Sequence, residues 1–357
     1  MKRRTFLTLT LAAALLLCAC TGKPAASSSA STASSYPDSR DDVTKAFVNA
    51  RYSDIPSQTV EHGEDYIIQW ADPAMEEHIR FLLDKPEGDI RHSDVWDLQV
   101  LVLRVNQSDG FDVALEQPVS GDSFTFETVE TNPEVRHLYN GHAFQNLSSL
   151  EDLKHFDSLQ YFSYTASLPY DGLNDLSGLR ECENLRVLYL CNVRPEALDP
   201  LGSLSELQTL TLYNCGVLDL TPLKTLSALA SLSLNVDQID SLEPLTALPH
   251  LSYLGIGSGS TYPSLEPLVQ MNLQYLDMSC GMFDREQYET LDYTPLTKIK
   301  SLVGLDLTYH TRADQALCEA ILANNPNLKY LDISYTEAAE SGAKFDVAYL
   351  KDARLRG

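Results

Sequence analysis

Large apolar residues recur along most of the chain with the spacing Leu-x-x-Leu-x-Leu. From Leu185 to Leu273 the first leucine of the pattern returns every 22 residues, four times in succession. Alternate apolar positions predict a short β-strand whose leucines all point to one side. One such turn cannot bury its own apolar face, so a core forms only when neighbouring turns stack. The pattern therefore predicts a repeat solenoid over residues 98–336.

We number the places of each repeat from its first leucine, so that the apolar residues of the strand occupy the first, fourth and sixth places. The repeats defined in this way begin at Leu98, Leu159, Leu185, Leu207, Leu229, Leu251, Leu273, Leu302 and Leu328, with a looser one at Val135.

A second pattern runs in step with the strands, because a proline directly before a leucine recurs in successive repeats. These prolines are Pro200, Pro222, Pro244, Pro267 and Pro295. Gly178 takes the same place one repeat earlier. Proline breaks a helix and favours a tight extended or 3₁₀ return on the convex side. A long array of amphipathic helices, the alternative architecture, is disfavoured by these prolines and by the fixed step.

The repeats resemble those of the leucine-rich-repeat family, specifically its internalin-like class with 22 residues per turn. The segment 207–229 is close to that consensus, with Cys215 in the usual Asn or Cys position. The resemblance implies an α/β solenoid, a horseshoe or arc whose short parallel strands line the concave face. It also implies binding rather than catalysis, although fold alone does not fix function.

Departures from the regular step predict local features. The longer step from Leu273 to Leu302 places extra residues at about 283–291, which we expect to form a protruding loop. The return before Leu328 has helical apolar spacing and predicts a helix there. Met75 and Ile79 form a helical stripe that ends before Pro86, which predicts a capping helix within an N-terminal region of residues 42–97. An insertion at about 104–134 separates the first two turns, and residues 337–357 form a C-terminal cap or tail.

The N-terminus reads as an export signal, with three basic residues followed by an apolar run of residues 6–17 that is too short to span a bilayer. The run ends in Leu17-Cys18-Ala19-Cys20, which resembles the lipobox of bacterial lipoproteins. This resemblance implies cleavage of a signal peptide of residues 1–19 and lipidation of Cys20. Residues 20–41 are rich in Ser and Ala and predict a flexible tether.

Charge and cysteine content narrow the possible partners. A formal net charge of −24 argues against a nucleic-acid partner and favours a basic one. Five cysteines remain beyond the lipobox, at irregular spacings that fit neither a disulfide scaffold nor a zinc site. We expect them to be buried small apolar residues, with a Cys191–Cys215 bridge as the alternative.

No motif of known catalytic chemistry occurs in the sequence, so we expect neither an enzyme nor a cofactor or metal. The glycines at 255, 257 and 259 fall where a repeat strand ends, which favours turn formation over phosphate binding. His137 and His142 form the closest histidine pair, which is a weak metal signal. An enzyme using the region 42–134 is the remaining catalytic alternative.

The third, fifth and seventh places of each strand point away from the leucine core and predict a ligand-binding concave face. Tyrosines occur there repeatedly, and exposed Tyr provides rigid contact area with a polar tip. Three aspartates share the fifth place of successive turns and predict attraction for a basic group. Bound calcium and a merely solvated face are the alternatives. The candidate binding residues are Tyr161, Tyr189, Tyr213, Tyr253, Tyr275, Tyr330, Asp277, Asp306 and Asp332.

The sequence thus predicts a binding protein of the bacterial cell envelope, anchored to the membrane through lipid on Cys20 and facing outward. Its partner would be a protein or peptide held on the concave face. A structural or spacer protein of the envelope, whose concave face binds nothing specific, is the second class of function.

Overall fold

The computed structural model describes residues 60–105, 145–167, 172–236, 238–257, 260–280, 288, 290–342 and 354–356. All of them belong to one compact unit, Pro37–Gly357. The signal peptide, the lipobox cysteine Cys20 and the tether lie outside the described residues, as do the insertion 104–134 beyond Val105 and the pair His137 and His142.

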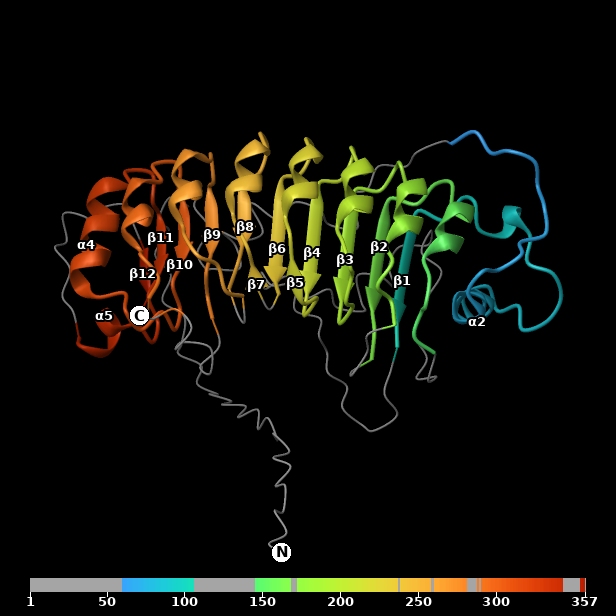
Figure 1. Ribbon diagram of the computed structural model, residues 1–357, viewed down its shortest axis with the longest axis horizontal. Coiled ribbons are helices and arrows are strands. Elements are labelled where there is room, and N and C mark those ends of the chain that lie inside the picture. Colours follow the sequence, from blue (N-terminus) through green and yellow to red (C-terminus); the bar gives the residue numbers. More distant parts are fainter. Residues whose placement is uncertain are drawn as a thin grey trace, which may run out of the picture. The chain divides into compact units, whose positions relative to one another are not determined.

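Short parallel strands, one from each turn, form a single open sheet in chain order (Figure 1). Within the described residues it contains ten strands: β1 Val100–Arg104, β2 Tyr161–Thr165, β3 Val187–Cys191, β4 Thr209–Tyr213, β6 Ser231–Asn235, β8 Tyr253–Gly255, β9 Tyr275–Asp277, β10 Gly304–Asp306, β11 Tyr330–Asp332 and β12 Arg354–Arg356. Two further short strands, β5 Val217–Leu218 and β7 Gln238–Ile239, pair with each other beyond the ends of β4 and β6.

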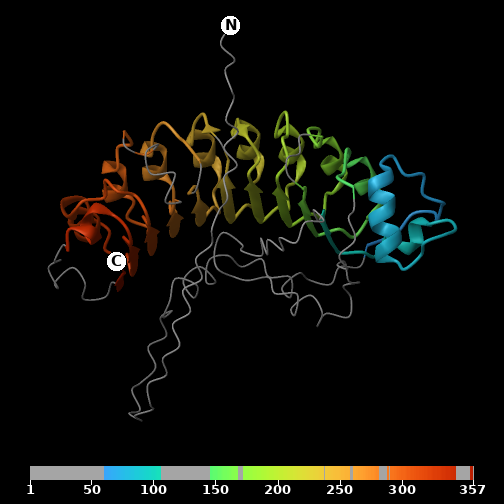
Figure 2. The ribbon, with the colours of Figure 1, turned by 90° about the horizontal axis from the view of Figure 1, so that it is seen from below.

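The opposite side of the stack carries the returns, so that strands and 3₁₀ turns lie on its two sides (Figure 2). The 3₁₀ turns are η2 His92–Asp94, η3 Glu151–His155, η4 Ser177–Glu181, η5 Asp199–Ser203, η6 Thr221–Thr225, η7 Glu243–Ala247, η8 Glu266–Gln270 and η10 Thr294–Lys298. Each of the five prolines of the sequence pattern stands at the start of one of these turns. Gly178 replaces proline in η4, where a side chain is excluded because its Cβ would lie 2.1 Å from the carbonyl oxygen of Leu150.

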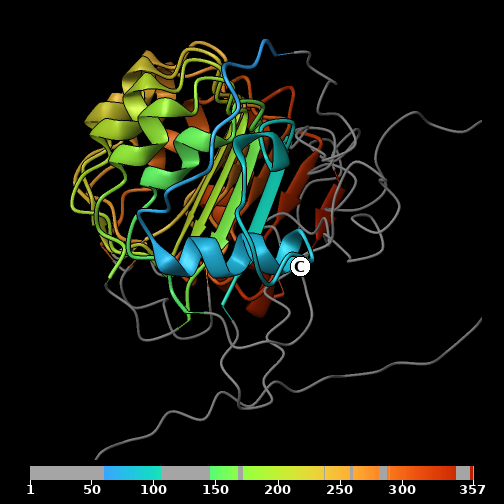
Figure 3. The ribbon, with the colours of Figure 1, turned by 90° about the vertical axis from the view of Figure 1, so that its right-hand side faces the viewer.

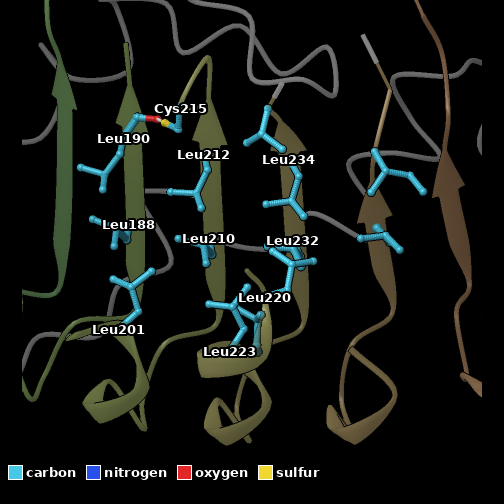
Figure 4. Close-up of a cluster of buried hydrophobic side chains, with 14 of the residues drawn as sticks. Leu188, Leu190, Leu201, Leu210, Leu212, Cys215, Leu220, Leu223, Leu232 and Leu234 are labelled. Atoms are coloured by element: carbon cyan, nitrogen blue, oxygen red, sulfur yellow. Dashed lines mark hydrogen bonds between the residues drawn. The ribbon is translucent and has the colours of Figure 1, made fainter. Parts of the chain in front are cut away.

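The register of the sheet confirms the leucine-rich-repeat solenoid. Leu210 of β4 pairs with Leu232 of β6, which pairs with Leu254 of β8, so equivalent places of successive repeats stand side by side. These leucines are fully buried between the strands and the returns (Figure 4). The looser repeat expected at Val135 lies outside the described residues, and β1 pairs directly with β2.

Near the C-terminal end the return changes from 3₁₀ turn to α-helix, as its apolar spacing predicts. Helix α4 spans Gln315–Asn324 and is capped by Asp314, whose carboxylate accepts the N–H of Leu317. The short helix α5, Glu337–Glu340, follows β11. The expectation of a protruding loop at 283–291 is wrong for Tyr288, which is buried and donates from its hydroxyl to the carbonyl of Ser260 at 2.7 Å.

Helix α2, Pro73–Leu82, lies across the N-terminal end of the solenoid (Figure 3). Its apolar stripe, including Met75 and Ile79, joins the leucine core. Asp72 caps the helix through Oδ1 and reaches the first turns through Oδ2, which accepts the N–H groups of Ser148 at 2.6 Å and Ser149 at 3.0 Å. Asp152 accepts the backbone N–H of Asp72 in return. Two carboxylates therefore fasten the capping helix to the solenoid.

Candidate functional site

The tyrosines of the third place lie on the sheet face opposite the leucine core. Tyr253, Tyr275 and Tyr330 form an apolar cluster of their own, separate from the main core. Strand alternation explains this separation, because the third place points to the face opposite that of the fourth. The side of the sheet expected from the sequence is therefore the side observed.

Two of these rings form a stack along the sheet. The rings of Tyr253 and Tyr275 are parallel to within 8° and their centroids are 5.4 Å apart. Glycine also occurs on this face. Gly255 holds the fifth place of β8, and Gly304 holds the third place between Tyr275 and Tyr330.

These tyrosines are less accessible than the sequence suggests. Tyr253 and Tyr275 are 0 % exposed and Tyr330 is 5 % exposed. Tyr161 is also buried, whereas Tyr189 and Tyr213 are half-buried. The expectation of fully solvent-exposed rings is therefore wrong, and the part of this face where tyrosine is accessible is at β3 and β4. The role of these residues in binding stays a prediction.

The three aspartates of the fifth place stand in one column. The parallel register pairs Asp277 with Asp306 and Asp306 with Asp332. Beyond Asp332 the register continues to Arg356 of β12, so a basic residue follows the three acidic ones in the same row. The three carboxylate residues are buried, with 4 % exposure at most. They do not form the freely solvated column that was the alternative.

Each of these aspartates also holds the end of its strand. The Oδ1 atoms accept the N–H of the residue two positions later, at 2.9 Å from Ser279, 2.9 Å from Thr308 and 3.0 Å from Ser334. The hydroxyl of Tyr330 donates to Oδ2 of Asp332 at 3.0 Å. Such side-chain turns fix the carboxylates in place. Neighbouring charges at the strand spacing of about 4.8 Å repel by roughly 3 kcal/mol at an intermediate dielectric.

A second cluster, which sequence reasoning missed, joins the N-terminal region to the first turns. His62 lies between two carboxylates, with Nε2 2.7 Å from Asp97 Oδ1 and Nδ1 3.1 Å from Asp157 Oδ2. The other carboxylate oxygen of Asp157 is 3.1 Å from Nε2 of His92. The ring of His62 stacks on Trp96 at 4.5 Å. No sequence spacing links these residues, so only the fold brings them together.

The protonation of this cluster follows from its hydrogen bonds. Slight burial lowers the pKa of His62, but the hydrogen bonds to Asp157 and Asp97 outweigh it and raise the pKa above the usual value. Both ring nitrogens then donate, which only the imidazolium form allows. Deeper in the same region, burial lowers the pKa of His155 to about 4. The hydrogen bonds of this cluster, named here the clasp, join His62 to Asp97 and Asp157 and so connect the N-terminal region to the first turns.

The five cysteines of the repeats are all buried and none of them forms a disulfide, so the alternative of a Cys191–Cys215 bridge is wrong. Cys215 instead directs its sulfur toward the carbonyl oxygen of Leu190 at 3.5 Å (Figure 4). Burial raises the pKa of Cys182, Cys215 and Cys318 to about 12. These thiols therefore stay protonated and serve as small core residues.

Across the described ranges, no group of three or more His, Cys, Asp or Glu side chains is arranged to hold a metal ion. In the same part of the chain, no helix is both long enough and apolar enough to cross a membrane.

Comparison with known proteins gives likenesses of fold. No protein-family description matches the chain, and no curated protein sequence does. Among solved structures, internalin C2 of Listeria monocytogenes is 19% identical, with a TM-score of 0.42 over 72% of this chain and 91% of that one. An internalin (inlF) of the same organism is 18% identical, with a TM-score of 0.31 over 80% of this chain and 94% of that one. Both scores are low, so the leucine-rich-repeat assignment stands on the repeat register and the leucine core of the chain itself.

Proposed function

We propose that this chain is a cell-surface binding protein whose solenoid engages a protein or peptide through the concave face of the sheet. The observation that carries the proposal is the set of tyrosines on the sheet face opposite the leucine core, among which Tyr189 and Tyr213 are partly exposed. A repeat of this kind needs apolar residues only on its core side. Aromatic residues gathered on the opposite side are typical of binding surfaces, where they provide rigid contact area.

The partner we propose is basic. Three aspartates in one column give this part of the face a concentrated negative charge, within a chain of net charge −24. Opposite charges at an interface speed the encounter between partners and make its rate depend on salt. The aspartates accept hydrogen bonds from the following turn, and these bonds hold the carboxylates in place before binding. The entropic cost of ordering the carboxylates on binding is therefore lower.

Attachment to the membrane through lipid on Cys20 completes the proposal. The lipobox-like sequence before Cys20 supports it, together with the Ser- and Ala-rich residues 21–40. Two acyl chains provide stable anchoring, and a tether would hold the solenoid away from the bilayer. This places the protein in the bacterial cell envelope, facing outward.

The test begins with capture of partners from surface extracts by the lipid-free ectodomain, followed by binding kinetics on the captured protein. We expect Tyr275→Ala to raise the dissociation rate, by a free energy of roughly 1–2 kcal/mol. Tyr275→Phe retains the ring and serves as the folded control, with thermal unfolding measured for both variants. A triple variant with Asn at Asp277, Asp306 and Asp332 should slow association and flatten its salt dependence.

The chain offers a matched control for the triple variant. Three aspartates just before 3₁₀ turns make the same hydrogen bond to the N–H two residues later but lie exposed outside the sheet: Asp175, Asp219 and Asp292. Replacing these three aspartates by Asn removes the same amount of charge, but from the 3₁₀ turns and not from the sheet. The association rate should then stay nearly unchanged. Equal slowing by both triple variants would mean that only net charge matters. Capture of no partner would favour the spacer protein, whereas a captured partner with kinetics unchanged in every variant would place the binding site away from this column.

A further inference from the structure

The eighth place of several turns, just after the strand, adopts a left-handed backbone. In early turns this place holds Asn192 and Asn214, with φ of 60° and 53°. Asparagine tolerates this conformation better than other non-glycine residues. The two side chains also serve the fold, since Nδ2 of Asn214 donates to Oδ1 of Asn192 at 2.9 Å. Asn192 in turn donates to the carbonyl of Ala166. The choice of asparagine here is explained by folding alone.

In the turns of β10 and β11 the same place holds tyrosine. Tyr309 and Tyr335 have φ of 66° and 60°, which is unusual for a bulky aromatic residue. Their rings stack on each other with centroids 4.4 Å apart and an angle of 7° between the planes. Tyr335 is 55 % exposed. The backbone conformation does not explain the choice of tyrosine, because asparagine would adopt it at lower cost.

The chain around this tyrosine pair is acidic in sequence. Residues 304–342 contain six carboxylate side chains and two basic ones. Helix α5 begins two residues after Tyr335, and its Glu337 and Glu340 are exposed. The face of an aromatic ring carries negative electrostatic potential and attracts cations. Among cationic side chains, the planar guanidinium of arginine stacks best on an aromatic face.

We propose that the Tyr309–Tyr335 pair is a docking point for an arginine side chain of the partner protein. The guanidinium stacks on the exposed ring of Tyr335, and the carboxylates of α5 supply the opposite charge. This inference rests on the proposed function, because it assigns a specific contact to a basic partner. It places that contact at the strand ends of the last turns, beside the concave face rather than on it.

The experiment uses fluorine NMR on the full chain labelled with 3-fluorotyrosine and purified in a non-ionic detergent. Tyr335→Phe removes one resonance and so identifies the signal of Tyr335. The probe is the peptide acetyl-Gly-Arg-Gly-Arg-Gly-amide, compared with its lysine and citrulline counterparts. We expect the arginine peptide to shift the Tyr335 signal saturably, the lysine peptide to bind several-fold more weakly and the uncharged citrulline peptide to cause no shift.

The loss-of-function variant is Tyr335→Asn, which installs the residue that early turns carry at this place. For this variant we expect unchanged or higher thermal stability and about tenfold weaker binding of the arginine peptide. Binding to the variant is measured from the shifts of the remaining tyrosine signals. Tyr275→Ala should leave peptide binding intact. An equal response to citrulline, or a response to maltohexaose but not to the arginine peptide, would overturn the inference. If Tyr275→Ala weakens binding of the captured partner while Tyr335→Asn does not, the proposed function stands and this inference fails.

Discussion

The removal of the Asp72 side chain tests how the N-terminal helix is fastened to the solenoid. In Asp72→Ala the cap of α2 is lost, which costs about 1 kcal/mol. The N–H groups of Ser148 and Ser149 also lose a charged acceptor. Because Ser148 is exposed and Ser149 half-buried, water replaces part of these bonds, so about 1 kcal/mol each is reasonable. The variant also relieves the repulsion between the carboxylates of Asp72 and Asp152, which offsets a small part of this loss of stability. We expect a loss of about 2–3 kcal/mol in total.

The chain provides a local reporter for this experiment, because its two tryptophans, Trp70 and Trp96, both lie in the N-terminal region. Urea unfolding followed by tryptophan fluorescence should show a midpoint lowered by about 1 M or more. Far-UV circular dichroism, which reports the solenoid, should shift less, since each turn contacts only its neighbours. Glu77→Ala removes one charge from the exposed side of the same helix and should change stability by about 0.5 kcal/mol or less. If the fluorescence midpoint of Asp72→Ala equals that of Glu77→Ala, Asp72 does not hold the cap.

Three further perturbations probe the core, the charge state and the anchor. Leu232→Ala should cost about 2–5 kcal/mol by urea unfolding, because it leaves a cavity at a fully buried position between two neighbouring turns. Burial lowers the pKa of His78 and His155 to about 4, so each favours folding while neutral. Their contribution is complete above the unfolded pKa of about 6.5 and is lost as pH falls toward 4, so the fluorescence midpoint should be lower at pH 5 than at pH 7.5. Cys20→Ala should abolish labelling by radioactive palmitate and release the protein from membranes.

Each of these outcomes has a control or a contrary result. Ser233→Ala, one place after Leu232, lies away from the leucine core, although it is buried rather than exposed as expected from the sequence. It should cost much less than Leu232→Ala, and equal losses would mean that the strand register is wrong. His62, with its raised pKa, acts in the opposite sense and stabilises at low pH, so His62→Gln should steepen the loss at pH 5. A pH-independent midpoint, or a Cys20→Ala protein that remains fully membrane-bound, would refute the corresponding reasoning.

Local pattern was enough to predict the architecture of the repeats. The first, fourth and sixth places are apolar because every turn must bury the same face against its neighbours, so the signal repeats and reinforces itself along the sequence. Proline marked the returns for a local, conformational reason, whereas glycine at 178 is required by close contact with the backbone of the preceding turn. The stripe of Met75 and Ile79 identified α2 for the same reason.

Irregular segments were predicted less well, because their contacts are specific to one place in the fold. Tyr288 belongs to an expected protruding loop, yet it is buried and its ring contacts Tyr262 and His310. Nothing in its neighbours along the chain signals that burial.

The sequence by itself determined which residues face the core and which share a column, because strand alternation and the place of the first leucine in each repeat fix both. The leucine pattern alone places Asp277, Asp306 and Asp332 in one row, although their repeats differ in length. Only the tertiary structure decided how accessible such residues are and what they contact. Burial and hydrogen bonding depend on what lies against a surface, and that is a property of distant parts of the chain. For the same reason the His62–Asp157 clasp and the left-handed tyrosine pair emerged only from the folded molecule.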